Sequence, residues 1–118
     1  KHMPETIFSK IIRREIPADI LYEDQFCVGF RDANPQAPTH VLIIPKEPIN
    51  NLNSVEGENN ELLGHLLLIG KKIAKEENID KTGYRIVINT GPDGGQTVDH
   101  LHLHLIGGTH LGWPPFKN

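Results

Sequence analysis

The sequence has little of what marks several large classes of protein. Only one of its 118 residues, Cys27, is a cysteine, so no disulfide can form within the chain. The formal charge of -3 provides no basic excess for a nucleic acid polymer or for anionic lipid. The most apolar stretch, Leu62 to Ile69, is less than half of the roughly 20 residues that a membrane span needs. With no basic leader and apolar segment at its start, we expect a cytoplasmic protein.

The length and the hydrophobic pattern favour one small α+β domain. We expect residues 4–118 to share a single core, and Lys1 to Met3 resemble a cloning remnant. Helical spacing of apolar residues and short strand-like runs predict a short helix, three strands, a long helix and two strands. An antiparallel sheet with both helices on one face fits this order. The expected ranges are 6–14 and 59–78 for the helices, and 20–22, 26–32, 40–45, 84–89 and 100–106 for the strands.

Three histidines lie in one alternating run, His100-Leu101-His102-Leu103-His104-Leu105. Successive side chains of a strand point to opposite faces, so the three imidazoles should share one face while the leucines enter the core. A solvated strand face accepts polar residues of any type, and histidine is an uncommon choice for it. The cluster therefore indicates a chemical role.

Two kinds of chemistry use such a cluster. Zinc holds nitrogen ligands at about 2.0–2.1 Å, but the outer histidines of a strand run lie roughly 13 Å apart. A metal site would therefore need a further ligand, for which His40 and Cys27 are the candidates. Nucleophilic catalysis needs no such convergence, because a central imidazole can attack while its neighbours donate hydrogen bonds or fix its tautomer. His102 suits this role best, and we expect catalysis without a metal or a cofactor.

The loop before the histidines has the composition of an oxyanion site. Gly91, Gly94 and Gly95 allow the backbone to turn with positive φ and to expose amide hydrogens, and a nest of such amides binds phosphate oxygens. Thr97 adds a hydroxyl and Asn89 adds an amide. No Gly-Lys-Ser/Thr follows, so this is not a Walker loop. Its position predicts a phosphate site beside the histidines.

The histidine run resembles the signature of the histidine-triad superfamily, His-φ-His-φ-His-φ-φ with φ apolar. Further matches resemble the Hint branch and extend over nearly the entire chain after Met3. Two positions depart from the pattern: Arg31 stands where some relatives carry histidine, and Asp99 where tyrosine is frequent. The matching segments are Thr6-Ile7-Phe8, Glu15-Ile16-Pro17, Phe30-Arg31-Asp32, Pro35 to His40, Gly83-Tyr84-Arg85, Gly94-Gly95-Gln96 and Gly112 to Pro115.

This resemblance implies a homodimer, joined edge to edge through its sheets, that hydrolyses purine nucleoside phosphoramidates or similar adenylates at the α-phosphorus. His102 would be the nucleophile that forms a nucleotidyl-histidine, and His104 would contact the phosphate or the leaving group. His100 and His40 would support them. Asp32 would hold the ribose of a purine nucleoside monophosphate such as AMP or GMP. The other expected nucleotide contacts are Phe8, Ile11, Ile16, Phe30 and Ala33 at the base, and Asn89, Gly95, Gln96 and Thr97 at the phosphate.

Other functions are compatible with the same residues. A dinucleoside polyphosphate hydrolase of the Fhit branch is one, although Gly107-Gly108 and the Trp-Pro-Pro terminus argue against it. A nucleotide-binding scaffold with incidental hydrolysis is another, and a metal-binding module is a third.

Several of the singled-out residues also have plain structural interpretations. Asp32 could cap a turn, and Phe8 and Ile11 could belong to the core stripe of the helix. His65 is expected to be structural or solvent-facing, and Cys27 to be a small core residue.

Overall fold

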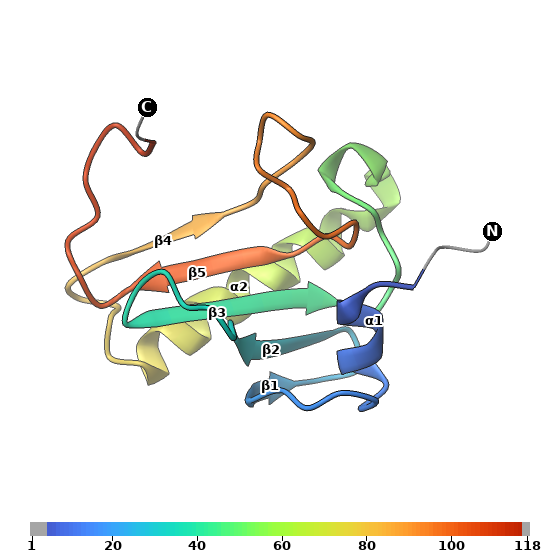
Figure 1. Ribbon diagram of the computed structural model, residues 1–118, viewed down its shortest axis with the longest axis horizontal. Coiled ribbons are helices and arrows are strands. Elements are labelled where there is room, and N and C mark those ends of the chain that lie inside the picture. Colours follow the sequence, from blue (N-terminus) through green and yellow to red (C-terminus); the bar gives the residue numbers. More distant parts are fainter. Residues whose placement is uncertain (1–4, 117–118) are drawn as a thin grey trace.

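The computed structural model describes residues 5–116, in which five strands form one antiparallel sheet in the order β1-β2-β3-β5-β4 (Figure 1). The α+β class, with one short and one long helix, is confirmed. Lys1 to Met3 lie outside the described residues. The elements are α1 (Ile7–Ile12), β1 (Ile20–Glu23), β2 (Cys27–Arg31), β3 (Thr39–Pro45), two short 3₁₀ turns (Leu52–Ser54 and Gly57–Asn59), α2 (Asn60–Glu76), β4 (Tyr84–Val87) and β5 (Leu103–Gly107).

Among residues 5–116, no helix has the length and apolar character needed to span a membrane.

The two helices cover opposite faces of the sheet, so the prediction that both lie on one face is wrong. Figure 1 shows α2 behind the sheet and α1 in front of it. Alternate residues of β3 explain this arrangement: Val41 and Ile43 belong to the cluster packed against α2, whereas Leu42 and Ile44 pack with residues of α1. Every residue of β3 is buried, so neither face of this strand is left to solvent and each face can pack against a helix.

A capping box fixes the start of α1. The Thr6 hydroxyl accepts a hydrogen bond from the Ser9 N–H, and the Ser9 hydroxyl accepts one from the Thr6 N–H. Phe8 and Ile11 are buried against the sheet, while Ile7 is 53% exposed. The helix therefore presents Phe8 to the same face of the sheet that carries the histidines.

Gly70 lets α2 lie close to the sheet. A β-carbon at this position would lie 3.0 Å from Cδ1 of Ile86 on β4 and 3.3 Å from Cδ1 of Ile43 on β3, which is tighter than ordinary packing. The buried side of the helix is formed by Leu66, Ile69, Gly70, Ile73 and Ala74. Leu67 lies outside this buried side and is 46% exposed.

The last strand begins later than predicted. β5 starts at Leu103, so His100 and His102 precede it. The final pair of the β3–β5 ladder is Ile43 with Leu103, and two residues farther along β3 stands Pro45, which has no N–H to donate. The Leu101 N–H bonds instead to the Ile49 carbonyl, at 2.7 Å.

The predicted alternation nevertheless persists through this irregular segment. Leu101, Leu103 and Leu105 are all 1% exposed or less. The histidine side chains therefore remain on the face opposite α2.

Candidate active site

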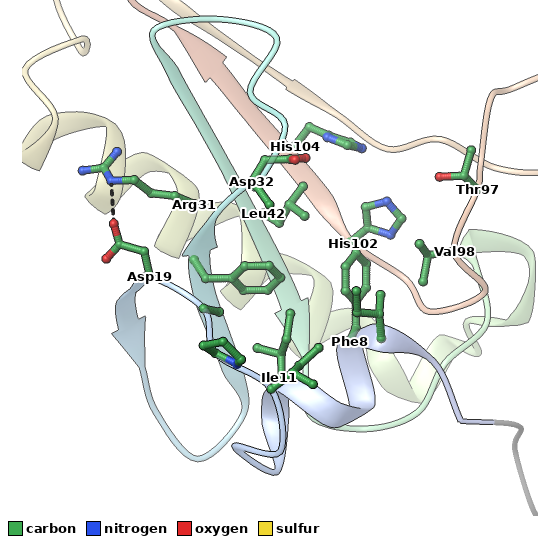
Figure 2. Close-up of a pocket in the computed structure, with 16 residues that line it drawn as sticks. Phe8, Ile11, Asp19, Arg31, Asp32, Leu42, Thr97, Val98, His102 and His104 are labelled. Carbon is green, nitrogen blue, oxygen red and sulfur yellow. Dashed lines mark ion pairs between the residues drawn. The ribbon is translucent and has the colours of Figure 1, made fainter.

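The histidines border a cavity of about 610 Å³ on the α1 face of the sheet. A volume of this size accommodates a nucleotide-sized ligand. Figure 2 shows Thr97 at one side of the cavity and the Arg31–Asp19 ion pair at the other, with Phe8 and Ile11 between them. The lining is mostly apolar; one set of polar groups lies around His102 and His104, and the Arg31–Asp19 ion pair lies at the other side.

The bonds of His100 and His102 determine which nitrogen of His102 is free to react. The Nε2–H of His100 donates to the Pro45 carbonyl at 2.8 Å. The Nδ1–H of His102 donates to the His100 carbonyl at 2.7 Å. In the neutral ring the proton is then on Nδ1, so Nε2 of His102 carries a lone pair. Phe8 packs edge-to-face on the His102 ring, with centroids 5.0 Å apart, and holds its plane.

A second relay fixes His104 in the opposite tautomer. The Gln36 N–H donates to Nδ1 of His40 at 3.0 Å, so the proton of His40 lies on Nε2. That proton is donated to Nδ1 of His104 at 2.9 Å. Nε2 of His104 therefore carries a hydrogen. The site pairs one imidazole whose Nε2 can attack with one whose Nε2–H can donate, and their ring centroids are 5.0 Å apart.

Burial keeps these imidazoles neutral. Desolvation lowers the pKa of His100 and of His102 below the ordinary value for histidine. Burial, reinforced by the positive charge that His102 and His40 carry when protonated, lowers the pKa of His104 to about 4. At neutral pH the lone pair of His102 is therefore not blocked by a proton.

Asp32 combines a capping role with a position on the cavity wall. One oxygen, Oδ1, accepts a hydrogen bond from the Asn34 N–H at 2.8 Å, as in an Asx turn. The other, Oδ2, lies 3.4 Å from Nε2 of His40. The carboxylate also lines the cavity, so the capping interpretation and the ligand-binding one are compatible.

The glycine-rich loop is held by two amide side chains. Nδ2 of Asn89 donates to the Gly94 carbonyl at 2.7 Å. Oε1 of Gln96 accepts the Gly91 N–H, and its Nε2 donates to the Asn50 and Val98 carbonyls. Asn89 and Gln96 thus shape the loop, and neither they nor Gly95 line the cavity.

The three loop glycines serve two different needs. Gly91 and Gly95 have the expected positive φ, 74° and 81°. Gly94 does not: a β-carbon there would overlap the Thr90 carbonyl oxygen, so close approach is what requires glycine.

Most of the predicted site residues meet at this cavity. Those that line it are Phe8, Ile11, Ile16, Phe30, Asp32, Ala33, Thr97, His102 and His104; His40 and His100 lie behind the last two. Sequence reasoning missed Ile7, Pro17, Ala18, Asp19, Leu42 and Val98 as lining residues. The alternation of β3 could have identified Leu42, because it faces His104 across the ladder.

The two departures from the family pattern lie at different places. Arg31 lines the cavity and forms hydrogen bonds to both carboxylate oxygens of Glu77 at 2.8 and 3.0 Å, which raise its pKa. Its Nε also lies 3.4 Å from Asp19. Asp99 borders a neighbouring hollow that shares Thr97 with the cavity.

A metal at the histidine site would have its donors in Asp32, His40 and His104, whose ligand atoms lie within 4.8 Å of one another. Cys27 cannot contribute, because it belongs to the cluster on the opposite, α2 face. In the structure these donors already have partners: Nδ1 of His104 accepts the Nε2–H of His40. A metal here would have to break the relay from Gln36 through His40 that fixes the tautomer of His104.

Comparison with known proteins agrees with this geometry. The model of the HIT (histidine triad) domain matches residues 13–111. An uncharacterized HIT-like protein of Synechococcus elongatus is 64% identical over 94% of this chain and 96% of its own. A purine nucleoside phosphoramidase of Escherichia coli K12 is 54% identical over 92% of this chain and 91% of its own. The crystal structure of a HIT family hydrolase from Legionella pneumophila superposes with a TM-score of 0.93 at 47% identity, covering 95% and 100% of the two chains.

Fold, site and relatives together define a hydrolase. The chain belongs to the HIT domain family.

Proposed function

We propose that this protein is a purine nucleoside phosphoramidase that cleaves the bond between the α-phosphorus and an amine through a covalent intermediate on His102. The observation that carries the proposal is the pair of opposite tautomers at His102 and His104 beside one nucleotide-sized cavity. The name of the 54% identical Escherichia coli relative supports the substrate class.

In the first step, Nε2 of His102 attacks phosphorus in line with the departing amine. The new N–P bond forms as the P–N bond to the amine breaks. The amine nitrogen is a poor leaving group until it gains a proton. The negative charge of the bound phosphate favours protonation of His104, and this ring would pass the proton to the amine and return to its neutral form. The Thr97 hydroxyl, at the cavity wall, would stabilise the charge on the nonbridging oxygens.

In the second step, water attacks the same phosphorus, and His102 departs with its electron pair on Nε2. His104, now neutral, takes the proton that the attacking water loses, which restores the acid for the next turnover. The product is a purine nucleoside monophosphate, AMP or GMP. Phe8, Ile11, Ile16, Phe30 and Ala33 would pack on the purine, and Asp32 would accept hydrogen bonds from the ribose hydroxyls.

The direct test is steady-state hydrolysis of a fluorogenic adenosine phosphoramidate, with a chelator present, by the wild type and by His102→Ala. We expect the variant to lose turnover by about 10⁴-fold or more, while AMP affinity, measured by calorimetry, changes little. Near-normal turnover by the variant would refute the nucleophile. Turnover that the chelator abolishes would refute the metal-free scheme.

We also propose that the protein is a homodimer built on β4. Within the described residues β4 pairs only with β5, so its outer backbone groups form an open sheet edge. Leu67 and Leu68 of α2 are 46% and 62% exposed, an apolar surface that a second subunit could cover. Light scattering should give twice the 13.2 kDa mass of one chain, and a monomer mass at micromolar concentration would contradict the dimer.

A further inference from the structure

A second polar cluster lies on the α2 face, away from the histidine site. It contains one carboxylate, one thiol and one imidazole, from Asp24, Cys27 and His65, and their ligand atoms lie within 4.8 Å of one another. Asp24 stands in the turn between β1 and β2, Cys27 begins β2, and His65 lies on α2. Thiolate, imidazole and carboxylate are the donors that zinc uses in proteins.

The Asp24 carboxylate is already held in position. Its Oδ1 accepts the N–H groups of Phe26 and Cys27 at 2.7 and 2.9 Å. Its Oδ2 accepts the Tyr22 hydroxyl at 2.8 Å and lies 2.6 Å from Nε2 of His65. Burial alone would raise the pKa of Asp24, but the hydrogen bonds from Phe26, His65, Tyr22 and Cys27 hold it well below the usual range. Because this carboxylate is held in position and its Oδ2 is bonded to side chains with exchangeable protons, a cation can take the place of those protons.

The surroundings favour entry of a cation. A hollow of about 410 Å³ opens at His65 and Phe26 and is also lined by Glu47, Glu58 and Glu61. Within residues 5–116, none of these three glutamates forms an ion pair with a basic side chain. The negative charge of these glutamates attracts cations to the opening of the hollow and raises their local concentration.

We propose that Asp24, Cys27 and His65 form a zinc-binding site, with a water from the hollow or the Tyr22 hydroxyl as the fourth ligand. Cys27 is fully buried and His65 is half-buried, so the metal would sit at the inner end of the hollow. Binding would release the thiol proton of Cys27 and move the proton of His65 from Nε2 to Nδ1, so that Nε2 offers its lone pair to the metal. Because zinc binds the thiolate and displaces the thiol proton, zinc affinity should increase with pH.

The test is a titration of untagged, metal-free protein with zinc in competition with a chromogenic chelator. We expect one zinc per chain for the wild type, with His65→Gln weakening binding by about 100-fold or more, beyond the usual cost of losing a supporting partner of a ligand. The matched control is His104→Gln, which removes a donor from the other three-donor cluster and should leave this affinity unchanged.

Cobalt substitution gives a second readout. A thiolate-to-Co²⁺ charge-transfer band should appear in the wild type and in His104→Gln, and disappear in Cys27→Ser. Because Cys27 is a core residue, circular dichroism must show that this variant is folded, and His65→Gln tests the site if it is not.

No zinc bound at micromolar concentration would overturn the site. Binding that survives His65→Gln but is lost in His104→Gln would also overturn it, because the metal would then occupy the histidine cluster.

Discussion

The two polar clusters of the molecule lie on opposite faces of one sheet and use their imidazoles in opposite ways. At the cavity, His102 and His104 bond through Nδ1 to a neutral partner, a carbonyl oxygen in one case and a neutral ring in the other. On the α2 face, His65 bonds to the ionised carboxylate of Asp24. The bonds at the cavity keep the buried rings of His102 and His104 neutral and leave Nε2 of each ring available for reaction. The bond of His65 instead points its Nε2 at the negative charge of the fixed Asp24 carboxylate. The bonding partner thus distinguishes the histidines that we propose to be reactive from the one that we propose to bind zinc.

The largest expected effect beyond loss of the nucleophile is that of His104→Ala. We expect turnover of an alkylamine phosphoramidate to fall by about 10³-fold, because the leaving amine loses its proton donor. With a nitrophenyl ester of AMP, whose leaving group needs no proton, the loss should be at least tenfold smaller. Equal losses for the two substrates would show that His104 does not act as the acid.

The loop glycine Gly94 offers a way to disturb the phosphate site without changing a polar group. Gly94→Ala should reduce the free energy of unfolding by about 1–3 kcal/mol and lower kcat/KM, since the new methyl group forces the loop away from Thr90. Gly64→Ala is the control, because open space surrounds that helical glycine; it should stabilise the protein by about 0.5–1 kcal/mol. Denaturant titration and kinetics of both variants check the pair.

The neutral state of the buried histidines predicts a loss of stability in acid. The pKa of His104 is about 4 in the folded protein and near 6.5 in the unfolded chain, so the unfolded chain binds the proton more readily below pH 6.5. The stabilisation is present above that pH and declines toward pH 4. Between pH 7 and pH 5, the free energy of unfolding should fall by about 2 kcal/mol more in the wild type than in His104→Asn. Exposed His110→Asn should behave like the wild type.

The smallest expected effect is that of His65→Gln. It removes one hydrogen bond to Asp24 and should cost about 1 kcal/mol of stability in the absence of zinc. Phosphoramidase activity should stay within about twofold of the wild type, because His65 lies on the other side of the sheet from the cavity. A large loss of activity would show that the two clusters are coupled.

Local sequence patterns predicted those features of the fold that depend on a single segment of the chain. Alternation in the histidine run placed Leu101, Leu103 and Leu105 in the core, although part of the run is not strand. The end of the β3–β5 ladder at Pro45 depends on pairing between distant segments, so the sequence of either segment alone did not reveal it.

The site was predicted less completely than the helices and strands, because its contacts also depend on pairing between distant segments. His40 and His104 are 64 positions apart and meet only because the β3–β5 register makes them diagonal neighbours. Gln96 resembled a phosphate ligand, but its partners include the Asn50 carbonyl, which the fold brings to it.

The stereochemistry of hydrolysis distinguishes double displacement at phosphorus from a single attack by water. A phosphoramidate made chiral at the α-phosphorus with sulfur and hydrolysed in isotopically labelled water would report the outcome. Attack by His102 and then by water inverts the phosphorus twice, so we expect net retention of configuration. Net inversion would mean that water attacks the substrate directly, and would contradict a covalent role for His102.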